Sequence, residues 1–424
     1  MTNNDVGEAK IEKKSLPVSQ IAGEGFRRYM FSAFAGNIAL PIFSLFVPLL
    51  ALKLGASVFE IGLVGGASNA VYSFMPFVMG RFSDRKQLGK LFIIASFVLL
   101  TIVSASYILI AQPLYLILAR VFEGIGWAML WPALTAEISR NLEPAEAKRV
   151  FSIYNITWSG AAAIGPLVGS ALIFFSSIQY AFLGTVFILM VSASVNIYPL
   201  LTRGRAAIEG NFLPISKTSR AEAKLSTAGQ PGSPNKSTVN LAFYMASCAL
   251  SAVASGVLFT FFAPYARSVG LSILVVGGIT FVFGLGRFIT YVLTVNESVR
   301  HLLLRNDRRV RNMIIALSFT TATSLVMLVR DPSGLTYLLA YALAGAGMSI
   351  VYGIAQAGMI AEATKGNYGR NAGLFESSIG IGASTGPILA GAISGNSIAL
   401  PFIVPFLGLI LYLVLLPLTT RRPR

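Results

Sequence analysis

The chain has 424 residues, of which 55% are hydrophobic and only 12% are charged, and its mean hydropathy is +0.71. Soluble globular domains carry about twice this share of charged residues, so the composition excludes a soluble globule and indicates a membrane protein. The net charge of +16 is explained by membrane topology and by attraction to anionic lipid headgroups, and we therefore expect no nucleic-acid partner.

Apolar runs of roughly 20 residues, the length that an α-helix needs to cross a bilayer, follow one another along the chain. They lack the period-two alternation of a membrane β-barrel, so the spans are expected to be helices. The sequence thus predicts an all-α membrane protein with twelve transmembrane helices. In chain order these helices cover residues 29–52, 58–80, 91–111, 114–138, 149–174, 179–201, 240–265, 273–295, 312–330, 335–361, 371–394 and 398–419.

Polar segments divide the expected helices into two sets. Residues 203–238 contain several Pro, Gly and Ser and few large apolar side chains, which predicts a cytoplasmic linker between two six-helix bundles. The bundles then cover residues 29–202 and 239–419, and the ends, 1–28 and 420–424, are expected to be cytoplasmic tails.

Basic residues support this orientation, because Lys and Arg stay on the cytoplasmic side during insertion. Of the 33 Lys and Arg residues, 28 lie in the segments that this arrangement places inside. The polar start carries acids as well as bases and shows no cleavage-like site. We expect a multi-pass protein of the plasma membrane, with both termini in the cytoplasm.

Several elements of the first half recur in the second half at fixed spacings. Gly165-Pro166 returns 221 residues later as Gly386-Pro387. The same offset relates Gly124, Gly126 and Arg149 to Gly345, Gly347 and Arg370, and an offset of 215 relates Gly55, Ser57 and Gly62 to Gly270, Ser272 and Gly277. A membrane chain made of two similar halves most simply encloses a cavity between them, as many carriers do.

Locally, Ser57-x-x-Glu60 predicts a capping box at the start of the second helix.

Three motifs of the first half resemble those of a known family, the major facilitator superfamily. They are Gly80-x-x-x-Asp84-Arg85 followed by Gly89-Lys90, then Arg120-x-x-Glu123-Gly124-x-Gly126, and finally Gly165-Pro166-x-x-Gly169. The third is similar to the Gly-Pro motif of the superfamily's antiporters. Two extra residues separate Arg85 from Gly89, and the second half has no clear copy of the first motif. The resemblance covers the whole chain and implies two pseudo-symmetric six-helix bundles of the drug/proton antiporter-like branch.

The resemblance also implies a cytoplasmic gate. In the family, the first motif latches the outward-open form, so Asp84 and Arg85 are expected to contact the end of the fourth helix. The alternative is a basic loop that only fixes topology. Glu137 and Glu362 close the inner ends of the fourth and tenth helices and are expected to form salt bridges with basic residues nearby. The gate candidates are Gly80, Asp84, Arg85, Arg140, Glu137, Arg149, Glu362 and Arg370.

Glycines spaced four apart let membrane helices pack closely, and a proline in the helix permits a bend. We expect such packing to seal the fifth helix against the eighth and the eleventh against the second. Ordinary helix packing without any meaning for antiport is the alternative. The residues concerned are Gly165, Pro166, Gly169, Gly382, Gly386 and Pro387.

Ionisable groups inside a bilayer are costly, so each is a functional candidate. Glu123 lies about ten residues into the fourth helix, ~15 Å deep at 1.5 Å per residue, where a carboxyl can carry a proton. Arg120 precedes it by one turn and can pair with it; a static ion pair is the alternative. Glu376 is a second candidate proton site. Arg287 lies in the inner third of the eighth helix, where it either binds substrate or only extends its charge to the cytoplasm.

Polar and aromatic residues on the expected helices are candidates for the lining of a central cavity. The chain has 29 Phe and 15 Tyr, which favours an amphipathic or apolar solute over a polyanion. Helix packing or lipid contact is the alternative for each. The candidates are Asn37, Asn69, Tyr72, Asn155, Trp158, Tyr352 and Gln356.

The function expected from these patterns is secondary transport by alternating access. One Cys, one His and the lack of a phosphate-binding Gly-x-x-x-x-Gly-Lys loop give no reason to expect a metal, a cofactor or an ATP-driven pump. We expect a monomer in the lipid bilayer that binds a small molecule and protons, and exports an amphipathic solute or drug by proton antiport. The alternative is a proton symporter or uniporter that imports a metabolite or organic acid. A membrane enzyme needs clustered catalytic residues and a sensor needs a signalling domain, and the sequence shows neither.

Overall fold

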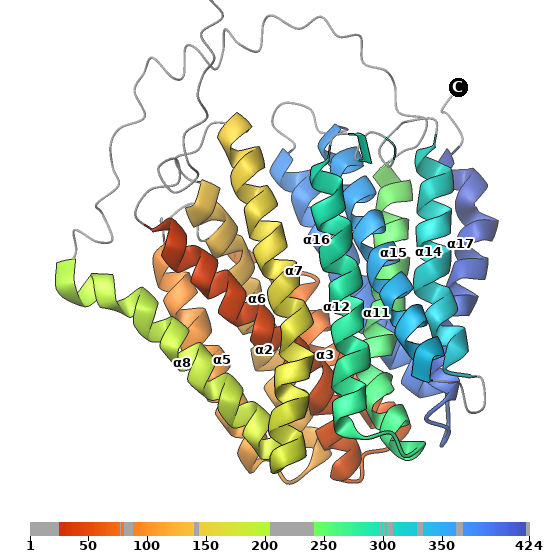
Figure 1. Cartoon of the computed structure of the whole chain (residues 1–424), viewed down its shortest axis with the longest axis horizontal. Coiled ribbons are helices and arrows are strands. Elements are labelled where there is room, and N and C mark those ends of the chain that lie inside the picture. Colours follow the sequence, from red (N-terminus) through yellow and green to blue (C-terminus); the bar gives the residue numbers. More distant parts are fainter. Residues whose placement is uncertain are drawn as a thin grey trace, which may run out of the picture.

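In the computed structural model, the described residues are 25–76, 78–79, 88–139, 144–203, 241–296, 298–299, 302, 308–328, 334–361 and 368–420. Twelve long α-helices lie within them (Figure 1), and each coincides with one of the twelve expected spans. The helices are α2 (Phe26–Lys53), α3 (Val58–Tyr72), α5 (Gly89–Leu109), α6 (Pro113–Ser139), α7 (Pro144–Phe175), α8 (Ile178–Arg203), α11 (Leu241–Ser268), α12 (Ile273–Val295), α14 (Arg309–Val326), α15 (Gly334–Ala361), α16 (Tyr368–Ile393) and α17 (Val404–Thr420). The all-α class and the twelve-helix plan are confirmed.

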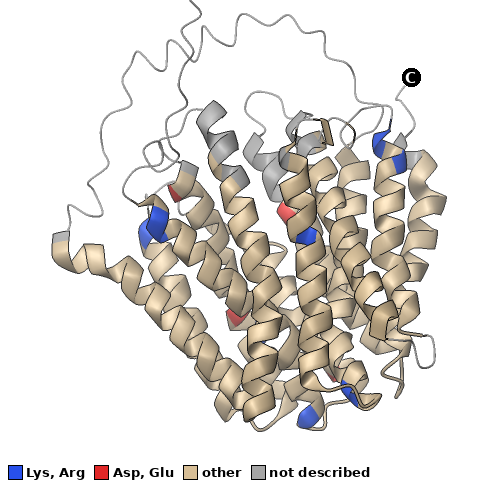
Figure 2. Cartoon of the chain, in the orientation of Figure 1, with Lys and Arg blue, Asp and Glu red and all other residues tan. Residues whose placement is uncertain are grey.

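Nine of these helices are long and apolar enough to cross a membrane by themselves within the described ranges. Of the other three, α3 has only 15 residues, whereas α14 and α16, with 18 and 26 residues, are long enough but less apolar. Charged side chains are sparse along the helices, as Figure 2 shows. A helix of mixed composition is stable in a bilayer when neighbouring helices cover it, which is the position of α3 and α16 against each other.

Three helix boundaries differ from the sequence prediction by five residues or more, and one of them is the start of α17, at Val404 after a short 3-10 helix rather than at residue 398. α3 ends at Tyr72 rather than at residue 80: a turn at residues 73–74 interrupts the helix, and residues 75–76 and 78–79 are helical again. Pro76 has no N–H to donate to the Tyr72 carbonyl oxygen, which fits a break at this point. α7 begins at Pro144, before the predicted start at residue 149. Proline is favoured at the first position of a helix, where its missing N–H costs nothing.

The two halves, coloured red to yellow-green and green to blue in Figure 1, lie side by side. In the first half α2 packs on α7 and α8, and α6 packs on α3 and α5. In the second half α11 packs on α16 and α17, and α15 packs on α12 and α14. Each of these four contacts in the first half therefore has its counterpart in the second.

Glycines of the repeat occupy matching contacts in the two halves. A Cβ on Gly165 would lie 2.5 Å from the carbonyl oxygen of Ile38 in α2, and a Cβ on Gly386 would lie 2.8 Å from that of Val253 in α11. Gly55 and Gly270 both adopt positive φ, at 81° and 85°, where their chains leave α2 and α11. The repeat in the sequence is thus a repeat in the packing.

Helix starts repeat in the same way. The Ser57 side chain accepts from the backbone N–H of Glu60, whose carboxylate accepts from the Ser57 backbone N–H at 2.7 Å. The predicted capping box is therefore confirmed. Ser272 caps α12 in the equivalent position.

Two helix pairs form the seams between the halves: α7 packs against α12, and α3 packs against α16. On the first seam, a Cβ on Gly277 would lie 2.9 Å from the Pro166 carbonyl oxygen and would also meet Ser170. On the second, a Cβ on Gly62 would meet the Pro387 carbonyl oxygen. These are the pairings expected between the fifth and eighth helices and between the second and eleventh.

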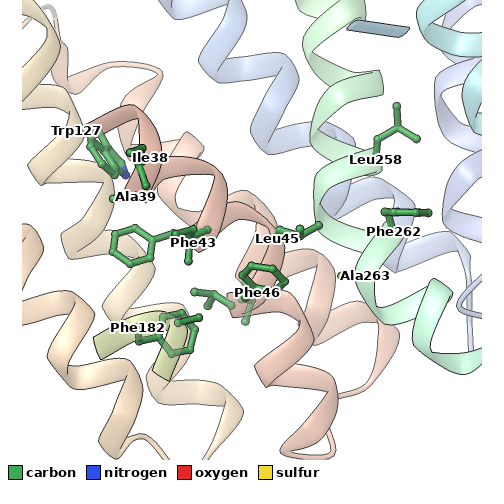
Figure 3. Packing of buried hydrophobic residues seen from close by; sticks show 14 of the residues in the cluster. Ile38, Ala39, Phe43, Leu45, Phe46, Trp127, Phe182, Leu258, Phe262 and Ala263 are labelled. Carbon is green, nitrogen blue, oxygen red and sulfur yellow. The ribbon is translucent and has the colours of Figure 1, made fainter. Parts of the chain in front are cut away.

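The buried hydrophobic core joins the halves at one end of the molecule. Figure 3 shows Leu45 and Phe46 of α2 opposite Leu258, Phe262 and Ala263 of α11, and all five belong to one cluster. At the other end, the second half keeps a cluster of its own among the described residues, which includes Phe243, Cys248, Val351, Phe375 and Tyr412. The halves therefore share a core near the turns that follow α2 and α11, and not at the end where α11 begins.

Candidate functional site

Glu123 lies at the centre of a buried hydrogen-bond network inside the first half. Its carboxylate oxygens accept from Nη1 of Arg120 at 2.6 and 2.7 Å, from the Tyr107 hydroxyl at 2.6 Å and from Nε1 of Trp127 at 3.0 Å. The Ser68 hydroxyl donates at 3.4 Å. Burial of a carboxylate requires such partners, because an unpaired charge in a low-dielectric interior is costly.

Arg120 is equally well satisfied. Besides Glu123, its guanidinium donates from Nε to the Val64 carbonyl oxygen at 3.0 Å and from Nη2 to that of Gly65 at 3.4 Å. The network ties α3, α5 and α6 together within one half. This geometry fits the static ion pair that was the alternative to a coupling role.

Glu376 lies instead on the seam between the halves. Its carboxylate, on α16, accepts from the hydroxyl of Tyr72 on α3 at 3.1 Å. Its charge also acts on Tyr154 of α7, Tyr352 of α15 and Cys248 of α11. Side chains from both halves thus converge on this carboxylate.

Arg287 lies on the other seam. Its guanidinium carbon is 4.1 Å from the centre of the Trp158 ring of α7, a cation–π contact between the halves. The ring of Tyr291, one turn further along α12, lies 6.5 Å from that of Trp158. Arg287 is only 7% exposed, yet its Nε and Nη2 atoms have no hydrogen-bond partner among the described residues.

The repeat relates these two places. Tyr72 and Arg287 are equivalent by the offset of 215, and Asn155 and Glu376 are equivalent by the offset of 221. The first-half counterparts of Arg287 and Glu376 are therefore Tyr72, which bonds to Glu376, and Asn155, which precedes Trp158 by one turn of α7. Both charged groups, Arg287 on α12 and Glu376 on α16, therefore belong to the second half, one at each seam.

Tyr352 of α15 lies within electrostatic range of both charged groups. The guanidinium of Arg287 and the carboxylate of Glu376 both act electrostatically on its hydroxyl, and its ring lies 6.0 Å from that of Phe375. Tyr72, Trp158, Tyr352 and Glu376 are each partly exposed. Tyr72, Trp158 and Glu376 also contact the opposite half.

The remaining predicted lining residues are dispersed. Asn37 is fully buried; its Nδ2 donates to the Ala33 carbonyl oxygen at 2.8 Å, and its Oδ1 has no partner among the described residues. Asn69 and Asn155 are partly exposed, and Gln356 is exposed on α15. The structure therefore brings together Tyr72, Tyr352, Arg287, Trp158 and Glu376 of the predicted set.

Most of the predicted gate lies outside the described residues. This is the case for Gly80, Asp84, Arg85, Arg140 and Glu362, and for the side chains of Arg149 and Arg370. Glu137 is described: it is buried, and its carboxylate accepts from the hydroxyl of Tyr29 on α2 at 3.3 Å.

The packing motif has two separate faces. Gly165 and Gly169 lie against Ile38 and Phe46 of α2, and Gly382 and Gly386 lie against Ala249 and Val253 of α11, so the glycines pack within their own halves. The carbonyl oxygens of Pro166 and Pro387 are the groups that face glycines of the other half.

Sequence reasoning missed several residues around the charged groups: Tyr107 and Trp127 at Glu123, and Tyr154, Tyr291 and Cys248 near Tyr352 and Glu376. Trp127 is four positions after Glu123, on the same helix face, and this spacing was an available signal. Tyr107 and Cys248 come from other helices, and no local pattern marks them.

Comparison with known proteins agrees with this architecture. The family model described as Major Facilitator Superfamily matches residues 29–356. No curated protein sequence matches this chain. No group of His, Cys, Asp and Glu able to hold a metal ion occurs among the described residues.

Solved structures of transporters share the fold. The nucleoside transporter NupG is 14% identical with a TM-score of 0.69, and the match covers 94% of this chain and 100% of that chain. The peptide transporter POT in complex with sulfate is 15% identical with a TM-score of 0.66, covering 95% and 98%. A POT family transporter in complex with 5-aminolevulinic acid is 11% identical with a TM-score of 0.68, covering 93% and 96%. At these identities the likeness concerns the fold.

Proposed function

Because the chain belongs to the Major Facilitator Superfamily and is a transporter of small molecules rather than an enzyme, we propose that it moves its solute by proton-coupled alternating access, with Glu376 as the shared site for proton and solute. The observation that carries this proposal is the position of Glu376: its carboxylate lies on the seam, bonded to Tyr72 of the other half. A group placed there experiences every change in the contact between the halves.

Glu376 suits coupling better than Glu123 does. Protonation of a carboxylate removes a charge, and this is costly where Arg120 and three other donors hold that charge. Glu376 is bonded to one neutral hydroxyl instead, so a proton or a cationic solute can replace the other in turn. The coupling role of Glu123 remains a separate hypothesis, which the same experiment tests.

We propose antiport, and hence export, as the direction. A proton and the cationic end of an amphipathic solute compete for one carboxylate, and competition for one site produces exchange. Aromatic side chains near this carboxylate, among them Tyr72, Tyr154, Tyr352 and Phe375, supply surface for the apolar part of such a solute. This proposal places the chain in the drug/proton antiporter-like branch of the family.

Symport or uniport of a metabolite is the second candidate, and Arg287 favours it. Its unpartnered nitrogens suit the carboxylate of an organic acid. The solved relatives named above carry peptides, nucleosides or 5-aminolevulinic acid in their descriptions, so the shared fold accommodates polar solutes.

We further propose that the transporter is a monomer in the plasma membrane, with cytoplasmic tails at 1–28 and 420–424. The bundles 29–202 and 239–419 are then joined by a cytoplasmic linker at 203–238. The distribution of Lys and Arg supports this orientation.

Proteoliposomes that contain a pH-sensitive dye test the proposal. A panel of amphipathic amines, organic acids, nucleosides and short peptides is added under an imposed pH gradient, and proton movement is recorded. Antiport gives solute efflux with proton entry, whereas symport gives solute accumulation with proton entry. Glu376→Gln should abolish proton movement, and Glu60→Gln, at the start of α3, is the matched control. Proton-coupled flux that survives in Glu376→Gln and is lost in Glu123→Gln would transfer the coupling role to Glu123.

A further inference from the structure

We propose that the solute is amphoteric: Arg287 binds its anionic group, and Glu376 binds its cationic group. This inference deepens the proposed function and depends on it for the location of the site. It names a substrate class, small molecules with a carboxylate-type anion and an ammonium held apart by an apolar spacer.

Arg287 has hydrogen-bond donors that the described residues do not use. Two of its nitrogens have no hydrogen-bond partner within the described ranges although the side chain is only 7% exposed, and a buried charge without partners is costly. The Trp158 ring covers one face of the guanidinium, but a cation–π contact leaves the in-plane N–H groups unused. A planar fork of N–H donors matches the two oxygens of a carboxylate.

Glu376 has the complementary property: it has hydrogen-bond acceptor positions that the described residues do not fill. A carboxylate offers about four acceptor positions, and the described residues fill one of them with the Tyr72 hydroxyl. An ammonium group has three donors and no acceptor. It fits the positions that remain.

The two charges do not neutralise each other. Within the described residues, neither Arg287 nor Glu376 forms an ion pair, although both act on the hydroxyl of Tyr352. They lie on opposite seams, on α12 and α16, and the repeat fixes these places. A solute with a single charge neutralises either Arg287 or Glu376 and leaves the other without a counter-charge.

Aromatic rings lie beside each charged group: Trp158 beside Arg287, and Tyr72 beside Glu376. Tyr352 and Phe375 pack edge to face with 6.0 Å between ring centres, and Trp158 and Tyr291 make a similar contact at 6.5 Å. Such rings accommodate a hydrocarbon spacer without a hydrogen-bond requirement. The solute class is therefore two opposite charges on an apolar body.

A matched series of probes tests the inference without any gradient. The probes are ω-amino carboxylic acids of increasing chain length, their methyl esters, which keep only the cation, and their N-acetyl derivatives, which keep only the anion. Dissociation constants come from thermal unfolding of the whole protein in lipid nanodiscs. In the wild type, at least one amino acid should bind about tenfold or more tightly than both of its derivatives, since a charge-assisted contact is lost in each.

Variants assign the two ends. Arg287→Gln should remove the preference for the amino acid over its methyl ester but keep the preference over the N-acetyl derivative, and Glu376→Gln should do the reverse. Arg287→Lys keeps the charge but not the fork and should fall between wild type and Arg287→Gln. The wild-type comparison does not depend on whether the variants fold.

Two outcomes separate this inference from the proposed function. If no amino acid in the series binds the wild type more tightly than its singly charged derivatives, including the case in which none binds, the amphoteric class is wrong, while Glu376-dependent proton movement can still be observed. If the preference is present but no probe moves protons in proteoliposomes, the coupled transport is wrong and the site stands.

Discussion

Arg120 and Arg287 show two ways in which a membrane protein keeps a buried guanidinium. Arg120 donates hydrogen bonds to Glu123 and to two carbonyl oxygens of α3. Arg287 stacks on the Trp158 indole, and two of its nitrogens have no hydrogen-bond partner in the part of the chain that the structure describes. A saturated network favours one arrangement and resists change, whereas an unsaturated one favours the binding of a further group.

The Arg120 network allows a prediction about stability. Removal of one member of a buried ion pair leaves an uncompensated charge, which costs about 3–5 kcal/mol. Glu123→Gln and Arg120→Gln should therefore each lower the unfolding temperature strongly, and the double variant Arg120→Met/Glu123→Leu should be more stable than either. Thermal unfolding of purified protein in nanodiscs measures this. Full stability in Glu123→Gln would contradict a structural pair.

The sequence identified both arginines and the two glutamates Glu123 and Glu376, because an ionisable residue in an apolar run is conspicuous. It did not distinguish their roles. The distinction depends on Tyr107 for Glu123 and on Trp158 for Arg287, and these partners come from other helices. Trp158 was singled out for the cavity, but nothing local indicated that it lies under a guanidinium.

At the level of helices, the seams depend on carbonyl oxygens that face glycines. A side chain at such a glycine must displace the backbone of the opposite helix, and overpacking of this kind costs about 1–3 kcal/mol. The contact on α12 has its counterpart on α3, where Gly62 faces Pro387.

Two adjacent glycines of α12 form a matched test. A Cβ on Gly277 would meet Ser170 and the Pro166 carbonyl oxygen, whereas a Cβ on Gly278 would have nothing within 4 Å. Gly277→Ala should lower the unfolding temperature and the transport rate. Gly278→Ala should leave the transport rate unchanged and can gain up to about 1 kcal/mol of helix propensity. Equal behaviour of the two variants in unfolding and flux assays would show that the seam is not closely packed.

The helix count and the pairing of seams were predictable, because apolar length marks membrane helices and the repeat fixes their pairing. The ends of α3 and α7 were less so. A break before Pro76 ends one helix early and Pro144 starts the other early, and hydropathy alone does not register either effect. The gate residues at 80–85 remain a prediction.

At the level of the whole molecule, the shared core lies near the turns that follow α2 and α11. Leu45 and Phe46 pack in one cluster with residues of α11 there. If both termini are cytoplasmic, this closed end faces outward, and the site between Arg287 and Glu376 is approached from the cytoplasm. A state that is open to the cytoplasm is the one in which an exporter binds its solute.

Cysteine labelling at the two ends of α2 tests this orientation. Arg27 and Lys53 are both exposed, at opposite ends of one helix. In a Cys248→Ala background, a membrane-impermeant maleimide added to intact cells should label Lys53→Cys and spare Arg27→Cys until the cells are opened. The reverse pattern would place the termini outside.

The matching seams indicate that the two halves can assemble without a covalent link between them. The halves recognise each other through α7 with α12 and α3 with α16, and each half repeats the internal contacts of the other. Two polypeptides, one ending after α8 and one starting before α11, should therefore find each other in a cell membrane and restore transport by complementation. Neither fragment alone should do so, and a Gly277→Ala fragment should complement poorly.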